Sequence, residues 1–149
     1  MLQFQSICCP LDFSESTSSI YNLAIQLAVN SQAEINLISI VPATYQGDIA
    51  EYGFLGRFVE EAYAQSEADL KVVVDKIKAD YPFLIVHSKV LKNNFVAPAI
   101  LEYLQENNID LVIMGTHGRR GLEKIFMGSV AEEVLKKATC PVLTLRIKA

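Results

Sequence analysis

Five short apolar segments, separated by longer segments with helical features, constrain the fold of this chain more than any other feature. Apolar runs without polar alternation are typical of strands that are buried on both faces. When such strands alternate with helices, they predict an open α/β fold in which helices cover both faces of a parallel sheet. The five predicted strands are Ser6–Leu11, Glu34–Val41, Phe83–Leu91, Asp110–Met114 and Val142–Ile147.

Four helices are predicted between these strands, three of them from apolar residues at the spacing of an amphipathic helix. The first follows Ser14, a candidate N-cap, and the fourth follows Ser129, which would form a capping box with Glu132. Pro98 would lie in the first turn of the third helix. The second helix is expected over about 58–80. This leaves 42–56 as a glycine-bearing loop, either an ordinary connection or a flap over a site.

Composition narrows the class of protein. The chain has 149 residues, a length that favours one domain over residues 1–149. Its net charge of −4 argues against a general nucleic-acid binder. Cys8, Cys9 and Cys140 do not have the spacing of a disulfide framework or a zinc site, and the two adjacent ones should point to opposite faces of a strand as core residues. Without a signal-peptide pattern or a membrane-length apolar run, we expect a soluble cytoplasmic protein.

The segment 115–129 carries the strongest functional signal. It follows the carboxyl end of the fourth strand, where open parallel sheets bind ligands. Its glycines let backbone N–H groups approach an anion, and Gly128-Ser129 opens a helix whose N-terminus carries about half a positive charge. We therefore expect the segment to bind a phosphate rather than only to turn the chain. Its basic residues outnumber its one acidic residue: Arg119, Arg120 and Lys124 against Glu123.

The glycine spacing resembles that of a known family. Gly115-x-x-Gly118, nine residues, then Gly128-Ser129 resembles the nucleotide-binding signature of the universal stress protein family. The segments 9–14, 110–119 and 140–143 are also similar to those of the family, so that the resemblance covers the whole chain. Two departures stand out, since Phe13 replaces a common glycine and 92–95 lacks the usual glycine before the third helix. The signatures of a P-loop and of a dinucleotide-binding fold are absent.

The resemblance implies a Rossmann-like sheet of order 3-2-1-4-5, of the adenine nucleotide alpha hydrolase-like type. It also implies that ATP, with Mg²⁺ bound through the phosphates, lies between the first and fourth strands. The Ser-Gly-Gly-x-Asp-Ser loop of the related ATP pyrophosphatase-type enzymes is absent. The expected nucleotide-binding residues are Pro10, Asp12 and Val41 beside the adenosine, Met114 and Gly115 near the ribose, His117, Gly118, Gly128, Ser129 and Val130 near the phosphates, and Arg119.

Several of these residues have a structural alternative. Asp12 fits a contact with a nucleotide or metal and a helix cap equally well. Ser129 fits a cap whose hydroxyl also donates to a phosphate, and His117 fits either a phosphate contact or an ordinary exposed loop. His87 receives no role, because no partner for it is visible in the sequence. For the cysteines, a thiol switch is the alternative to a structural role.

These observations favour an ATP-binding regulatory module of the stress response that is not an enzyme. The apolar edge strand Val142–Ile147 favours a homodimer through that edge, because an unprotected edge pairs readily with another chain. A slow ATPase is one alternative, since phosphoryl transfer depends more on positioning than on covalent chemistry. A dimeric interaction protein that ignores nucleotides is the other. No nucleic-acid or membrane partner is expected.

Overall fold

The computed structural model describes residues 3–43, 52–117 and 127–146, with side chains from residue 56 onward in the second range. In these ranges five strands form one parallel sheet of order β3-β2-β1-β4-β5, which confirms the predicted fold class and strand order. The strands are β1 (Ser6–Pro10), β2 (Glu34–Val41), β3 (Val86–Lys92), β4 (Leu111–Gly115) and β5 (Val142–Leu145). The helices are α1 (Thr17–Ser31), α2 (Tyr52–Asp80), α3 (Val96–Glu106) and α4 (Ser129–Lys137).

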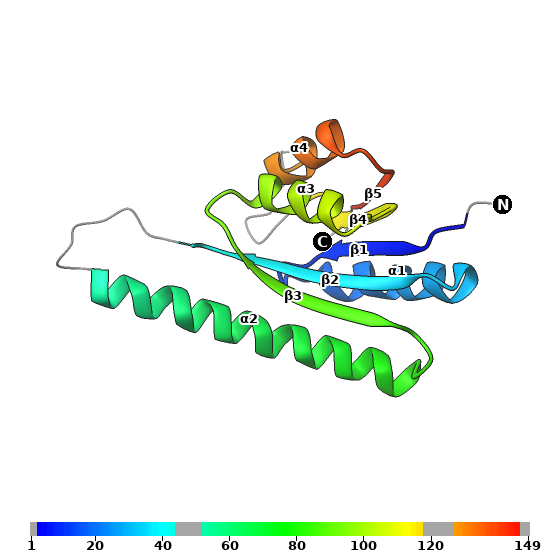
Figure 1. Cartoon of the computed structure of the whole chain (residues 1–149), viewed down its shortest axis with the longest axis horizontal. Helices are drawn as coiled ribbons and strands as arrows, with labels where there is room; N and C mark the ends of the chain where they lie inside the picture. The colour runs from blue at the N-terminus through cyan, green and yellow to red at the C-terminus, as the bar shows by residue number, and fades with distance from the viewer. Residues whose placement is uncertain (1–2, 44–51, 118–126, 147–149) are drawn as a thin grey trace.

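Helices cover both faces of the sheet (Figure 1). On one face, Ile7 and Leu37 pack with Leu70 of α2 and with the buried side of α1. On the other face, Ile38 and Val112 pack against α3 and α4. Burying each such side chain contributes about 1.5–3 kcal/mol. Because both faces of the sheet are covered, the strands carry apolar residues at successive positions rather than at every second one. Among the described residues, no helix is both long and apolar enough to cross a membrane.

The adjacent cysteines lie in different layers of the core, as predicted. Cys9 packs in the cluster under α1 and α2, whereas Cys8 packs in the cluster under α3 and α4. Both are fully buried, and this burial raises the pKa of each thiol. Cys140 is half-buried, and burial also raises the pKa of its thiol. Since a protonated thiol is a poor nucleophile, these environments favour structural roles over a thiol switch.

The second helix begins earlier than predicted. α2 starts at Tyr52 rather than near Phe58, so part of the expected 42–56 loop is helical. Glycine lowers helix propensity by about 1 kcal/mol, which is why Gly53 and Gly56 indicated a loop. Gly56 lies on an exposed part of the helix. Residues 44–51 lie outside the described part, so the role of that connection stays a prediction.

The other differences are at element ends. β3 begins at Val86 rather than Phe83, because Leu84 N donates a 3.0 Å hydrogen bond to Tyr81 O and closes a turn there. β1 ends one residue before Leu11, and β5 is described only to Leu145 rather than to residue 147. Pro98 lies in the first turn of α3, as predicted.

Candidate functional site

The candidate site lies at the carboxyl ends of β1 and β4, which are neighbours in the sheet. The strand order reverses between them, since the chain adds β2 and β3 on one side of β1 and then β4 and β5 on the other. Open parallel sheets bind ligands beyond the strand ends at such a reversal. The segments that follow β1, β2 and β4 are therefore the ones that can form a site.

The side chain of Asp12 holds the turn between β1 and α1. Its Oδ1 accepts a 2.9 Å hydrogen bond from Ser14 N, as in an Asx turn. Ser14 O then accepts a 3.1 Å bond from Thr17 N. The chain thus makes a further turn before the helix, whose N-cap residue is Ser16, and the prediction that Ser14 is the N-cap is wrong. Asp12 therefore holds a turn and is not the helix cap that the sequence also allowed, because the N-cap residue is Ser16. Its contact with a nucleotide stays a prediction.

Gly115, the last residue of β4, lies against the start of α1. A Cβ at this position would be 3.2 Å from Ser16 Oγ and 3.4 Å from His117 O, so Ser16 would have to shift by a few tenths of an ångström to admit it. Ser16 Oγ lies 2.8 Å from Ser14 Oγ. The hydroxyl-rich turn after β1 and the end of β4 therefore meet at Gly115.

Thr116 fixes the chain just beyond β4. Its N–H donates a 3.0 Å bond to Leu145 O of β5, and its Oγ1 lies 3.0 Å from His117 Nδ1. Its carbonyl oxygen accepts a 2.6 Å bond from Gly128 N. A Cβ at Gly128 would lie 3.1 Å from that oxygen, so glycine permits this close approach. The start of α4 is thereby tied to the end of β4.

The N-terminus of α4 differs from the predicted capping box. Gly128 is the N-cap residue and Ser129 is the first helical residue, so Ser129 is not the cap. The Glu132 carboxylate instead accepts a 2.8 Å bond from Lys136 Nζ, which lowers the pKa of Glu132. Glu132 N is paired with Gly128 O at 3.0 Å, and the N–H groups of residues 129–131 precede this first α-helical bond. Such N–H groups are suited to an anion.

Val41 ends β2 beside this region and is buried. Its carbonyl oxygen accepts a 2.9 Å hydrogen bond from Asn93 N, and Ala43 N donates one of 2.9 Å to Asn94 Oδ1. Asn93 Oδ1 also accepts a 2.9 Å bond from Phe95 N at the start of α3. The segment without the usual glycine is therefore built from asparagine turns, which the Asn-Asn pair before a helix could have indicated.

Nine of the predicted site residues are described, and they lie at the strand ends or at the start of α4: Pro10, Asp12, Val41, Met114, Gly115, His117, Gly128, Ser129 and Val130. Gly118 and Arg119 lie outside the described residues. The sequence reasoning missed Ser16 and Thr116, whose contacts depend on Gly115 and Gly128. Contact of any of these residues with a nucleotide stays a prediction. Within the described ranges, no three His, Cys, Asp or Glu side chains lie together as a metal site would need.

The described site joins the ends of β1 and β4 to the start of α4, and comparison with known proteins identifies its family. A sequence model of the Universal stress protein family matches residues 3–146. The chain belongs to the universal stress protein family. This universal stress protein is 32% identical over 143 residues to the universal stress protein MJ0531 of Methanocaldococcus jannaschii, across 96% of this chain and 82% of the relative.

Solved structures show the same universal stress protein fold. The protein UspA from Lactobacillus plantarum superposes with a TM-score of 0.87 at 20% identity, over 98% of this chain and 100% of that one. A universal stress protein in complex with cAMP gives a TM-score of 0.69 at 20% identity, over 99% and 100%. One from Archaeoglobus fulgidus in complex with dAMP gives 0.64 at 16% identity, over 96% and 98%.

Proposed function

We propose that this universal stress protein binds ATP at the carboxyl ends of β1 and β4 and acts as a nucleotide-responsive regulatory module. The observation that carries the proposal is the 2.6 Å hydrogen bond from Gly128 N to Thr116 O, which fixes the N-terminus of α4 at the strand reversal. There the first-turn N–H groups and the helix dipole favour a phosphate. The cAMP and dAMP complexes of two proteins of the same fold support an adenine nucleotide as the ligand class.

Each part of the site has its own task in this proposal. Residues 128–130, with Gly118 and Arg119, would bind the phosphates, and Mg²⁺ would be held through those phosphates. Thr116 Oγ1 orients the His117 imidazole through Nδ1 at the end of β4. Pro10, Asp12 and Val41 would flank the adenosine. Met114 and Gly115 would lie near the ribose.

Binding rather than rapid hydrolysis is proposed as the principal activity. Asp12 is the one carboxylate among the predicted site residues, and it holds the β1–α1 turn through Ser14 N. A slow ATPase remains the second candidate, because hydrogen-bond donors that position the phosphates can by themselves accelerate phosphoryl transfer. Multiple-turnover phosphate release that is lost on changing Gly118 or Ser129 would establish it.

We also propose a homodimer through β5 in the cytoplasm. β5 is an edge strand, and all four of its residues, VLTL, are only partly buried or exposed in the single chain. Pairing with a second copy would satisfy the backbone groups of this edge and cover its side chains. The three free cysteines fit a reducing compartment.

The first experiment identifies any nucleotide released when the freshly purified protein is denatured. Gly128→Trp would place an indole against Thr116 O, whereas at Gly56 an added Cβ meets nothing within 4 Å, which makes Gly56→Trp a matched control. We expect ATP from the wild type and from Gly56→Trp, and none from Gly128→Trp.

Added ATP-Mg²⁺ tests the same site without relying on copurification. At a concentration about 100 times Kd it should stabilise the wild type by about 2.7 kcal/mol, and so raise Tm by roughly 5–10 °C. Gly128→Trp should show no such rise. A wild type that releases no nucleotide and whose Tm is unchanged by ATP-Mg²⁺ would mean that the glycine segment is structural. The nucleotide-independent interaction protein would then be the better account.

A further inference from the structure

A pocket lies at the amino ends of the strands, whereas the proposed nucleotide site lies at their carboxyl ends. It has a volume of about 300 Å³ and is lined by residues of β1, β2, β3 and the end of α3. Two lining residues, Ser6 and Glu34, are the first residues of β1 and β2, whereas the nucleotide site begins at the last residues of these strands. The two sites therefore lie at opposite ends of the strands of the same sheet.

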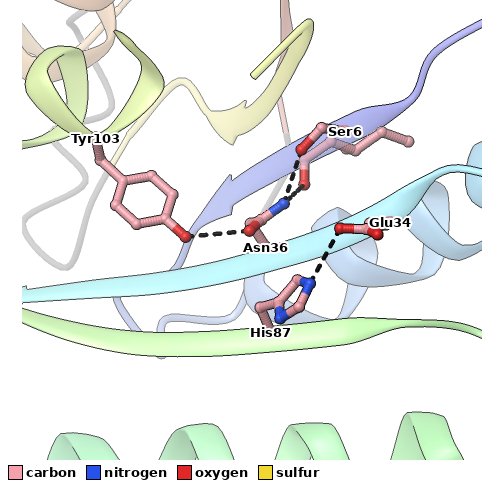
Figure 2. Close-up of polar contacts among 6 residues, drawn as sticks. Ser6, Glu34, Asn36, His87 and Tyr103 are labelled. Carbon is pink, nitrogen blue, oxygen red and sulfur yellow. Dashed lines mark hydrogen bonds and ion pairs between the residues drawn. The ribbon is translucent and has the colours of Figure 1, made fainter. Parts of the chain in front are cut away.

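The floor of this pocket is a buried polar network around Asn36. Asn36 Nδ2 donates a 3.0 Å hydrogen bond to Ser6 Oγ, and Tyr103 Oη donates one of 3.1 Å to Asn36 Oδ1 (Figure 2). Asn36 is 6% exposed and Tyr103 is 7% exposed. Burial raises the pKa of Tyr103 to about 12, so its hydroxyl keeps the proton that it donates. The floor is thus a fixed polar surface in an otherwise apolar layer.

The wall of the pocket carries charge. His87 Nε2 lies 3.0 Å from Glu34 Oε2, an ion pair when the imidazole is protonated, and both side chains are about half exposed. Lys89 also lines the pocket, two residues beyond His87 and so on the same side of β3. Among the described residues, no carboxylate lies within ion-pair distance of Lys89. The wall therefore combines the Glu34 carboxylate, which is hydrogen-bonded to His87, with a lysine that forms no ion pair in the described part of the chain.

We propose that this pocket binds a small monocarboxylate that also carries a hydroxyl group. Lys89 supplies one positive charge in a wall that also carries the Glu34 carboxylate, so the pocket suits a single carboxylate better than a phosphate monoester of about −1.5 to −2. The hydroxyl would bond to the oxygen of Tyr103, which donates to Asn36 and retains a lone pair. The volume is at the lower end of the range of ligand pockets, so the ligand is small.

The test is a ¹H–¹⁵N NMR titration of the full chain with lactate at constant ionic strength and saturating ATP. The added ATP keeps the nucleotide site from contributing. We expect saturable shifts at Asn36, 87–89 and Tyr103 with a millimolar Kd. Lys89→Gln should weaken binding at least tenfold. Lys71→Gln, which removes the same charge from the exposed face of α2, should leave Kd unchanged.

A second comparison tests the hydroxyl. Acetate, which lacks the hydroxyl, should bind more weakly than lactate, and Tyr103→Phe should remove that difference. Three results would overturn the proposal: no saturable shifts up to roughly 100 mM lactate, about a hundred times a 1 mM Kd; inorganic phosphate binding at least as tightly as lactate; or equal weakening by Lys71→Gln and Lys89→Gln. Both lysines are exposed, so the charge test does not depend on a core substitution.

Discussion

Phe13 has a backbone φ of 58°, in the left-handed region that favours glycine. Its half-buried ring packs against the core under α1 and α2, so the chain accepts the strain where the family commonly has glycine. We expect Phe13→Gly and Phe13→Ala to lose this packing alike. Alanine still pays the cost of a positive φ, whereas glycine does not, so the free energy of unfolding of the glycine variant should be higher by about 1 kcal/mol. Urea unfolding of both variants measures the difference, and equal stabilities would contradict the assignment.

Burial of the adjacent thiols predicts that they react slowly in the native protein and that the stability of the protein depends on pH. Because burial raises the pKa of Cys8 and Cys9, only Cys140 should react with a disulfide reagent in the native protein at pH 8. In the unfolded chain these thiols ionise near pH 8.5, so stability present below that pH should fall as pH rises above it. Thiol counts before and after denaturation, with unfolding measured at pH 7 and pH 9.5, test both. Rapid native labelling of all three cysteines would contradict the prediction.

At the scale of elements, Asp110 ties the start of β1 to the start of β4. Its carboxylate accepts hydrogen bonds from Gln5 N at 2.7 Å and from Ser6 N at 3.1 Å. Asp110→Ala would leave both donors to solvent at the end of a central strand, so the free energy of unfolding should fall by about 1–2 kcal/mol.

Asp75→Ala is the matched control for this element. Asp75 pairs with Lys71 on the surface of α2, where the two side chains are 60% and 74% exposed. Its loss should therefore change the free energy of unfolding by less than about 1 kcal/mol. Denaturation of the two variants compares them directly. A smaller effect at Asp110 than at Asp75 would show that the two backbone contacts do not secure β1.

At the scale of the whole molecule, the proposed dimer depends on an edge strand with apolar side chains. Leu143 of β5 is 38% exposed, and Leu143→Lys would place a charge in the proposed interface. We expect light scattering to give a dimer for the wild type and a monomer for the variant. Val72→Lys, at a position of α2 that is 66% exposed, should remain a dimer. A monomeric wild type would exclude pairing through β5.

The layers of this fold could be predicted from the amino-acid sequence. A strand that is covered on both faces is apolar along most of its length, so each strand can be recognised from its own residues. The positions of Cys8 and Cys9 followed from strand alternation alone. Helix and strand ends were less predictable, because glycine penalties of about 1 kcal/mol are easily offset by packing. The helix α2 continues through Gly56 and begins earlier than its glycines indicated.

The contacts within the site depend on how distant segments pack, so local sequence patterns did not predict them. Asp12 takes the Ser14 N–H and so moves the start of α1 to Thr17, and Gly128 replaces Ser129 as a cap because it reaches Thr116 O. The pocket at the amino ends of the strands could not be predicted for the same reason: Tyr103 lies 67 residues from Asn36, and His87 lies 53 residues from Glu34. Local periodicity fixes which face a side chain occupies. Which distant partner meets it there depends on how the strands and helices pack together.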